Sequence, residues 1–230
     1  MSTYERSPEE LRVRHLGTVP YGRALALQEQ VRARRQAGEV PDTVLLLEHP
    51  PVYTLGRRAL SSELPLPGEL LRERGIEVHE SDRGGRITYH GPGQLVAYPI
   101  VAVVDVVAYV RSLEAAIVIA LSRTGLSSRA RTEDGPDYTG VWTGERKIAS
   151  IGVHVQRGVT THGLAVNVSN DLEPFAWIDP CGLAGVQMTS LERELGDGCP
   201  SLEEFGALLV QGLCETLDRR PAPARRAVAA

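Results

Sequence analysis

Cys181 and Lys147 are the two residues whose type and surroundings best fit nucleophilic chemistry. Cys181 lies in the irregular segment IDPCGLAG, between Pro180 and Gly182, where free backbone N–H groups are expected. Such donors can stabilise an oxyanion next to a nucleophile. Lys147 stands at the start of the apolar segment KIASIGVHV, and desolvation in an apolar layer favours the neutral amine, which can shuttle protons. A nucleophile with its own proton carrier is therefore one interpretation of the pair.

Structural roles for the same residues are the other interpretation. Lys147 can lie at a frayed strand end and extend its ammonium to water, and Cys181 can be a plain loop residue. Cys199 lies in the polar turn GDGCPS, and Cys214 lies within a helical pattern, where a cysteine is typically a small buried hydrophobe. Three cysteines cannot all pair within the chain, which favours a reduced, cytoplasmic setting.

The glycine-rich stretch DRGGRITYHGPGQLVAYPI, residues 82–100, is a second candidate for function. Glycine clusters mark tight turns or a close approach of backbone to a ligand. The stretch matches neither GxGxxG nor GxxxxGK[ST], so no nucleotide site is predicted. His90 within it, and His49 before two prolines, are open to ligand contact, base or bracing roles. No HExxH or CxxC spacing occurs, so neither a metal nor another cofactor is predicted.

Composition limits the partners. The chain has 230 residues with a formal net charge of -4 and 42% hydrophobic residues, so it can bury a core but lacks the basic balance of a nucleic-acid-binding protein. The polar start MSTYERSPEELRVR is no secretory signal. Pro99 and Asp105 interrupt the apolar run of residues 95–110, which predicts a strand followed by a helix rather than a membrane span. We expect no membrane and no nucleic-acid partner.

Patterning predicts the elements that position these residues. Helical spacing covers residues 21–37, with Gly38 as its stop, and a second helix follows Asp105 as its N-cap. TVLLLEHPPVYTLG predicts two short buried strands separated by two prolines. The C-terminal helix opens with a capping box of Ser201 and Glu204. We expect one catalytic domain over residues 1–219 and a disordered tail over residues 220–230.

Residues 147–168 predict a β-hairpin that turns at an Arg-Gly pair. Without a bulge, Lys147 has the parity of the apolar residues Ile151 and Val153, and His162 has the parity of Leu164. Both polar side chains would then face an apolar layer.

Five segments, taken together and in this order, resemble the octanoyl (lipoyl) transferases of lipoate biosynthesis, the lipoate-protein ligase B family. They are EHPPVYTLGRR, DRGGRITYHGPGQLVAYPI, RKIASIGVHV, THGLAVNV and PCGL, spread over roughly residues 44–191. The resemblance implies an α/β (α+β) fold: a mixed, largely antiparallel sheet flanked by helices, as in the catalytic domains of biotin and lipoate protein ligases.

The resemblance also implies an activity. An octanoyl group would pass from octanoyl-acyl carrier protein to a specific lysine of lipoyl domains, in 2-oxoacid dehydrogenase E2 subunits or the glycine-cleavage H protein. Cys181 matches the nucleophile that forms the thioester, and Lys147 matches the lysine that lowers the pKa of its thiol; His49 and His162 are possible supporting residues. The implied substrate-binding residues are Arg83, Gly84, Gly85, Arg86, Ile87, Thr88, Tyr89, His90, Ser150, Ile151, Gly152, Gly163, Leu164 and Ala165.

Three other functions stay open at this point. An ATP-dependent lipoate or biotin ligase of the same fold needs no cysteine nucleophile. A cysteine hydrolase would pair Cys181 with a histidine base, for which His162 is available. A non-catalytic acyl-binding module would keep its function without Cys181 and Lys147.

Overall fold

An eight-stranded sheet forms the centre of the computed structural model, which describes residues 9–179 and 185–222. Its strand order is β11-β1-β2-β6-β10-β9-β8-β7. Only β1 pairs in parallel, with β2 and with β11, and every other neighbouring pair is antiparallel. The strands are β1 (Glu9–Thr18), β2 (Asp42–Glu48), β6 (Gln94–Ile100), β7 (Arg129–Ala130), β8 (Gly140–Thr143), β9 (Arg146–Gln156), β10 (Val159–Asn167) and β11 (Arg219–Pro221).

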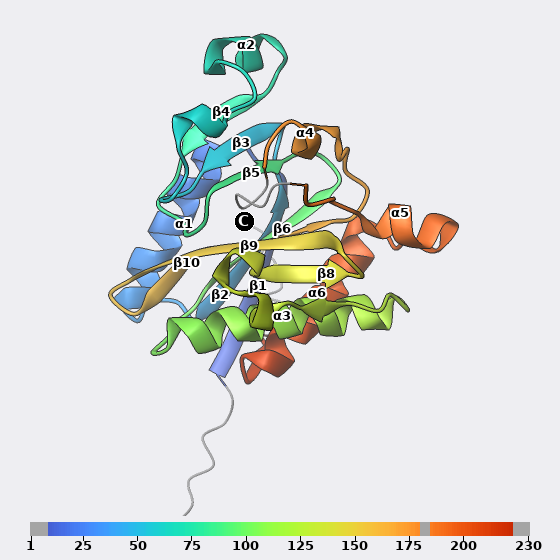
Figure 1. The fold of residues 1–230 in the computed structure, drawn as a ribbon. Helices are drawn as coiled ribbons and strands as arrows, with labels where there is room; N and C mark the ends of the chain where they lie inside the picture. Colours follow the sequence, from blue (N-terminus) through green and yellow to red (C-terminus); the bar gives the residue numbers. More distant parts are fainter. Residues whose placement is uncertain (1–8, 180–184, 223–230) are drawn as a thin grey trace, which may run out of the picture.

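A second sheet of three strands has the order β4-β3-β5, with β3 (Val52–Leu55) between β4 (Glu77–Glu80) and β5 (Ile87–His90). Pro50 and Pro51 separate β2 from β3, so the two short strands expected there belong to different sheets. The small sheet and the helix α2 (Gly68–Glu73) lie above the large sheet in Figure 1, with α3 on the opposite side.

Helices flank the large sheet. Helix α1 (Tyr21–Gln36) packs with residues of β2, β6 and β10 in one apolar cluster, whereas α3 (Val106–Arg123) and α6 (Leu202–Thr216) contribute to a larger cluster with β6, β8, β9 and β10. Two short helices, α4 (Glu173–Ala176) and α5 (Leu191–Leu195), stand before α6 in the chain. The expected mixed, largely antiparallel sheet flanked by helices is confirmed.

Local capping signals set where the long helices begin. Asp105 Oδ1 accepts hydrogen bonds from the backbone N–H groups of Val107 and Ala108 at 2.8 and 3.0 Å, and Ser201 forms the expected capping box with Glu204. Both caps satisfy N–H groups that have no partner within their helix. Within the described residues, no helix combines the length and apolar character that crossing a bilayer requires.

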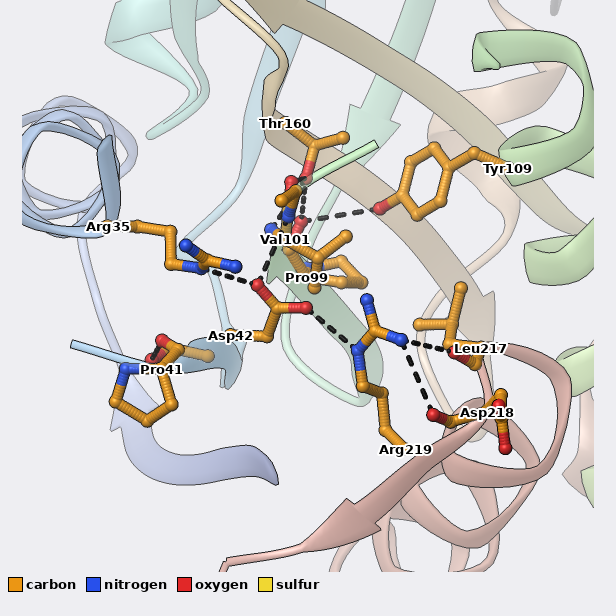
Figure 2. Close-up of polar contacts among 12 residues, drawn as sticks. Arg35, Pro41, Asp42, Pro99, Val101, Tyr109, Thr160, Leu217, Asp218 and Arg219 are labelled. Atoms are coloured by element: carbon orange, nitrogen blue, oxygen red, sulfur yellow. Dashed lines mark hydrogen bonds and ion pairs between the residues drawn. The ribbon is translucent and has the colours of Figure 1, made fainter. Parts of the chain in front are cut away.

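The buried carboxylate of Asp42 joins elements from the two ends of the chain (Figure 2). It is fully buried, and it accepts hydrogen bonds from Arg35 Nε at 2.6 Å, from Arg219 Nε at 2.9 Å and from the N–H of Ala102 at 3.1 Å. Strand β11 also takes in residues 220 and 221, so the expectation that disorder begins at residue 220 is wrong for these two.

Candidate functional site

A cavity lies between the two sheets, and three separate parts of the chain line it. They are the glycine-rich loop with β5, the middle of β9, and the middle of β10, joined by one residue of α1 and one of β6. The lining residues are Tyr21, Arg83, Gly85, Arg86, Ile87, Thr88, His90, Tyr98, Ser150, Ile151, Gly152, His162, Gly163, Leu164 and Ala165. All the substrate-binding residues expected from the sequence line this cavity except Gly84 and Tyr89.

Gly84 and Tyr89 lie beside the cavity and have other contacts. The N–H of Gly84 donates to the carbonyl of Val153 at 2.9 Å, which fixes the loop to β9, and Gly84 lines a neighbouring groove. Side chains alternate along β5, so Thr88 and His90 face the cavity while Tyr89 packs edge-on against Phe175 in the small sheet's own core.

Arg83 holds the glycine-rich loop against β3. Its buried guanidinium donates to the carbonyl oxygen of Thr54 at 2.6 Å and to Thr54 Oγ1 at 2.7 Å. A Cβ at Gly56 would lie 2.6 Å from the carbonyl oxygen of Gly85, and Gly85 itself has φ +88°. The glycines here are therefore explained by close backbone contacts within the loop and by a left-handed conformation.

Two glycines in the hairpin have a similar packing role. Gly152 and Gly163 stand opposite each other in the β9–β10 pair. A Cβ at Gly163 would lie 2.3 Å from the carbonyl oxygen of Ala97, and one at Gly152 would lie 2.9 Å from that of Gly84. Contact between strands, and between strand and loop, requires these two glycines whether or not a ligand is present.

Neutral histidines line and brace one part of the cavity. His90 Nδ1 bonds to Gln94 Oε1 at 2.7 Å, and burial lowers the pKa of His90 to about 3. His49 donates from Nδ1 to the carbonyl of Val19 at 2.6 Å, so its Nε2 accepts the hydroxyl hydrogen of Tyr98 at 2.7 Å. Burial lowers the pKa of His49 to about 4. His49 does not line the cavity, but it bonds to Tyr98, which does.

His162 sits in the cavity wall with an unusual backbone. Its φ is +58°, and its N–H donates to Gln28 Oε1 at 2.6 Å. Its ring lies edge-on to Tyr98 on the α1 side, whereas Leu164 belongs to the cluster on the α3 and α6 side. The expected shared face of His162 and Leu164 is wrong, because the left-handed residue breaks the alternation of the strand.

Asp82 fixes the tautomer of His162. Asp82 Oδ1 accepts from His162 Nε2 at 2.7 Å, which leaves Nδ1 as an acceptor, and Nδ1 is buried without a hydrogen-bond partner. Burial lowers the pKa of His162, against the opposing effect of Asp82.

Lys147 is fully buried, so the interpretation that it extends to water is wrong. Its Nζ donates to the carbonyl oxygen of Thr139 at 2.8 Å and lies 5.3 Å from the ring centroid of Trp142. The β8–β9 register shifts between Val141 and Trp142, which leaves Ile148 as an extra residue on β9. This bulge removes the regular alternation on which the parity of Lys147 depended, although the side chain is still buried.

Cys181 lies outside the described residues, but the chain that follows it pairs with Lys147. The N–H of Lys147 donates to the carbonyl of Gln187, and the N–H of Thr189 donates to the carbonyl of Lys147, both at 2.9 Å. Cys214 is buried in the core as expected, and Cys199 is half-buried against it rather than on the surface. Burial raises the thiol pKa of both described cysteines.

Lys147 and His162 lie far apart along the hairpin. His162 pairs with Val153, six positions beyond Lys147 on β9, which corresponds to about 20 Å along a strand. The fold therefore separates these two candidate proton carriers. Among the residues that the structure describes, no group of three or more histidine, cysteine, aspartate or glutamate side chains is arranged to hold a metal ion.

Comparison with known proteins shows the family to which the chain belongs. Residues 20–214 match the family model of the lipoyl protein ligase A/B catalytic domain. An octanoyltransferase of Rubrobacter xylanophilus is 50% identical, over 90% of this chain and 94% of that protein. The mitochondrial octanoyltransferase LIP2 of Arabidopsis thaliana is 42% identical, over 91% of this chain and 90% of that protein. The chain belongs to this family of octanoyltransferases.

Solved structures of related ligases share the fold of this octanoyltransferase family member. Lipoate-protein ligase A bound with ATP superposes with a TM-score of 0.75 at 20% identity, over 93% of this chain and 88% of that chain. A biotin protein ligase from Aquifex aeolicus gives a TM-score of 0.53 at 12% identity, over 90% of this chain and 69% of that chain. At these identities the likeness concerns the fold alone.

Tyr21, Tyr98 and Asp82 are the site residues that the sequence reasoning missed. Tyr98 and Asp82 lie within the quoted glycine-rich stretch, so closeness to other candidates was their only signal, whereas Tyr21, which begins α1, had no such signal. The arrangement provides a largely apolar cavity whose wall also contains neutral histidines and two arginines, and a buried lysine beside the chain that leads away from Cys181. These features fit the binding of an uncharged acyl chain.

Proposed function

We propose that this protein transfers an octanoyl group from octanoyl-acyl carrier protein to a specific lysine of lipoyl-domain proteins, through a thioester on Cys181. The observation that carries the proposal is the complete burial of Lys147, bonded to the segment that follows Cys181, in a chain 42–50% identical to octanoyltransferases. An amino group buried this completely needs hydrogen-bond partners, and the carbonyl oxygen of Thr139 is one.

The proposed reaction has two balanced steps. Lys147 takes the proton of the Cys181 thiol, and the thiolate attacks the donor thioester; the carrier thiolate leaves and receives that proton. The amine of the acceptor lysine then attacks the Cys181 thioester, Lys147 removes its proton, and the thiol of Cys181 is restored. Thioester exchange is nearly balanced and formation of the amide is favourable, so the reaction needs no ATP.

The cavity is the proposed site of the acyl chain. Ile87, Ile151, Leu164 and Ala165 are among its lining residues, and burial keeps His90 neutral near pH 7. A largely apolar wall matches an uncharged chain, and the two guanidinium groups of the lining residues, Arg83 and Arg86, are already bonded to Thr54 and Glu63.

An ATP-dependent ligase is the second candidate, because lipoate-protein ligase A bound with ATP has the same fold. The two functions differ in their need for nucleotide. The deciding experiment adds octanoyl-acyl carrier protein and a lipoyl domain to the purified protein in nucleotide-free buffer, with and without added ATP. Transfer without ATP supports the proposal, whereas strict dependence on ATP supports the ligase, and release of free octanoate without an amide supports a hydrolase.

Intact-mass measurement tests the nucleophile. Incubation with octanoyl-acyl carrier protein alone should add one octanoyl mass to the protein. The adduct should disappear in Cys181→Ser. It should persist in the matched double variant Cys199→Ser with Cys214→Ala, because Cys199 and Cys214 pack in the α3 and α6 cluster and do not line the cavity. An adduct that depends on Cys199 or Cys214 would overturn the assignment, and retained transfer by Cys181→Ser would exclude the thioester.

A further inference from the structure

The buried Nδ1 atom of His162 is an acceptor without a donor. Because His162 Nε2 donates to Asp82 at 2.7 Å, the neutral ring carries its lone pair on Nδ1. The side chain is only 3% exposed, it lines the cavity, and Nδ1 has no hydrogen-bond partner. A buried polar atom of this kind costs free energy unless a ligand or a water satisfies it.

The hydroxyl groups of two tyrosines in the cavity wall are already used. The hydroxyl of Tyr98 donates to His49 at 2.7 Å, and that of Tyr21 donates to Ser81 at 3.0 Å. His154 approaches the second oxygen of Asp82 at 3.5 Å and does not line the cavity. Gln28 Nε2 is also buried without a partner, and Gln28 does not line the cavity. From within the cavity, a ligand can supply the donor that completes Nδ1.

The backbone holds this atom in place. His162 has φ +58°, which is uncommon for a residue other than glycine. Gln28 Oε1 accepts the backbone N–H of His162 at 2.6 Å, and the next residue, Gly163, packs closely against the carbonyl oxygen of Ala97. Strained residues fixed by several contacts are concentrated at functional sites.

The strand register gives the position of His162 along the cavity. At one end of the cavity lining, Ala165 of β10 pairs with Ser150 of β9. His162 pairs with Val153, three residues further along β9. Three residues of strand span about 10 Å, close to the length of an extended eight-carbon acyl chain. Lys147 lies beyond Ser150 on β9, so an acyl chain whose thioester is near Lys147 points its terminal carbons toward His162.

We propose that His162, held by Asp82, is a specificity-determining residue at the terminal-carbon end of the acyl site, and that it lets this site accept medium-chain acyl groups with a terminal hydroxyl. The hydroxyl hydrogen would bond to Nδ1 in place of a water. A terminal methyl group that reaches the same depth displaces the water without replacing its hydrogen bond, which lowers affinity. The inference rests on the proposed function only in taking the cavity as the acyl site.

A matched pair of ligands tests the proposal. Nonanoate and 8-hydroxyoctanoate have chains with the same number of heavy atoms and differ only in a terminal methyl or hydroxyl. We expect calorimetric titration of the wild-type protein to show tighter binding of 8-hydroxyoctanoate. The preference, expressed as the ratio of the two dissociation constants, should fall about tenfold in His162→Leu, the change expected for one buried hydrogen bond.

Two further variants control for structure. His162→Asn should regain much of the preference, because asparagine tolerates a left-handed backbone and offers an oxygen close to the position of Nδ1. His154→Leu alters the other side of Asp82 and should keep the wild-type ratio. Independently of any variant, the ¹⁵N resonance of His162 Nδ1 in the wild-type protein should shift more with nonanoate, which removes its hydrogen bond, than with 8-hydroxyoctanoate, which replaces it.

An equal ratio in wild type and His162→Leu, or an Nδ1 resonance that responds equally to the two ligands, would overturn the proposal. Both readouts are binding measurements, so they hold even if the protein transfers no octanoyl group. Absence of octanoyl transfer by the wild-type protein would count against the proposed function instead.

Discussion

Nζ of Lys147 donates a hydrogen bond to the carbonyl oxygen of Thr139 at 2.8 Å, in a place where the lysine has no exposed surface. The path of this side chain crosses β8 at Gly140, where a Cβ would lie 2.9 Å from Lys147 Cε and 2.3 Å from the carbonyl oxygen of Ala149. The absence of a side chain at residue 140 therefore determines where the ammonium group can lie.

Gly140→Ala should displace Lys147 and impair transfer. Gly140 also has φ +131°, so the variant combines backbone strain with overpacking, which together cost about 1–3 kcal/mol in the free energy of unfolding. We expect kcat/KM for transfer to fall by at least about tenfold, because small misplacements of a reacting group are costly. Transfer kinetics and urea unfolding measure the two effects.

Gly144→Ala is the matched control. Gly144 has φ +54° in the turn after β8, and its Cβ would meet nothing within 4 Å. This variant should lower stability through backbone strain alone and leave transfer unchanged. Equal losses of activity in the two variants would contradict a positioning role for Gly140.

Asp42→Ala should destabilise the protein strongly. The change leaves the guanidinium groups of Arg35 and Arg219, which are 21% and 18% exposed, without their shared carboxylate (Figure 2). Removal of one partner from a buried ion pair typically costs about 3–5 kcal/mol. Asp137→Ala removes an exposed partner of Arg58 and should cost at most about 1 kcal/mol. Urea unfolding of both variants checks the difference, and similar losses would contradict the central role of Asp42.

Stability should fall on mild acidification because His90 stays neutral in the folded protein. Its pKa is about 3 in the fold and about 6.5 in an unfolded chain, so below pH 6.5 only the unfolded state takes up the proton. The free energy of unfolding should drop by about 2 kcal/mol per such histidine between pH 7 and 5. His90→Gln should remove that share of the drop, as measured by urea unfolding at both pH values. An unchanged pH dependence in the variant would show that His90 is not buried as a neutral ring.

Local sequence signals predicted much of this architecture. Asp105 and Ser201 bond to N–H groups within three residues of themselves, so the sequence alone could place the beginnings of α3 and α6. The prolines between β2 and β3, and the turn of the β9–β10 hairpin, are likewise short-range features.

Features that depend on distant partners were not predictable. Strand β1 was overlooked although Leu11 and Val13 alternate with arginines, because its neighbour β11 comes from the other end of the chain. The bulge at Ile148 and the left-handed His162 each depend on a partner strand or on Gln28. The periodicity of a single strand contains no information about a bulge or a left-handed residue. The assumed regular alternation therefore holds neither at Lys147, although that side chain is buried, nor at His162.

The charge of Lys147 and its ability to transfer a proton can be separated by substitution. Lys147→Arg keeps a cation, which favours the thiolate of a nearby Cys181, but a guanidinium does not give up its proton under ordinary conditions. Lys147→Ala removes both properties. Alkylation rate against pH should report a lowered Cys181 pKa in wild type, largely kept in Lys147→Arg and lost in Lys147→Ala.

Transfer to the acceptor lysine should fail in both variants, because the attacking amine lacks a base; loss of one general base typically costs about 10²–10⁴-fold in rate. Since Lys147 is fully buried, arginine is larger than its site, and circular dichroism with urea unfolding must show that each variant folds. Near wild-type transfer by folded Lys147→Arg would mean that charge alone is sufficient. An unchanged alkylation profile in Lys147→Ala would mean that Lys147 and Cys181 are not paired, and the proposed mechanism would be wrong.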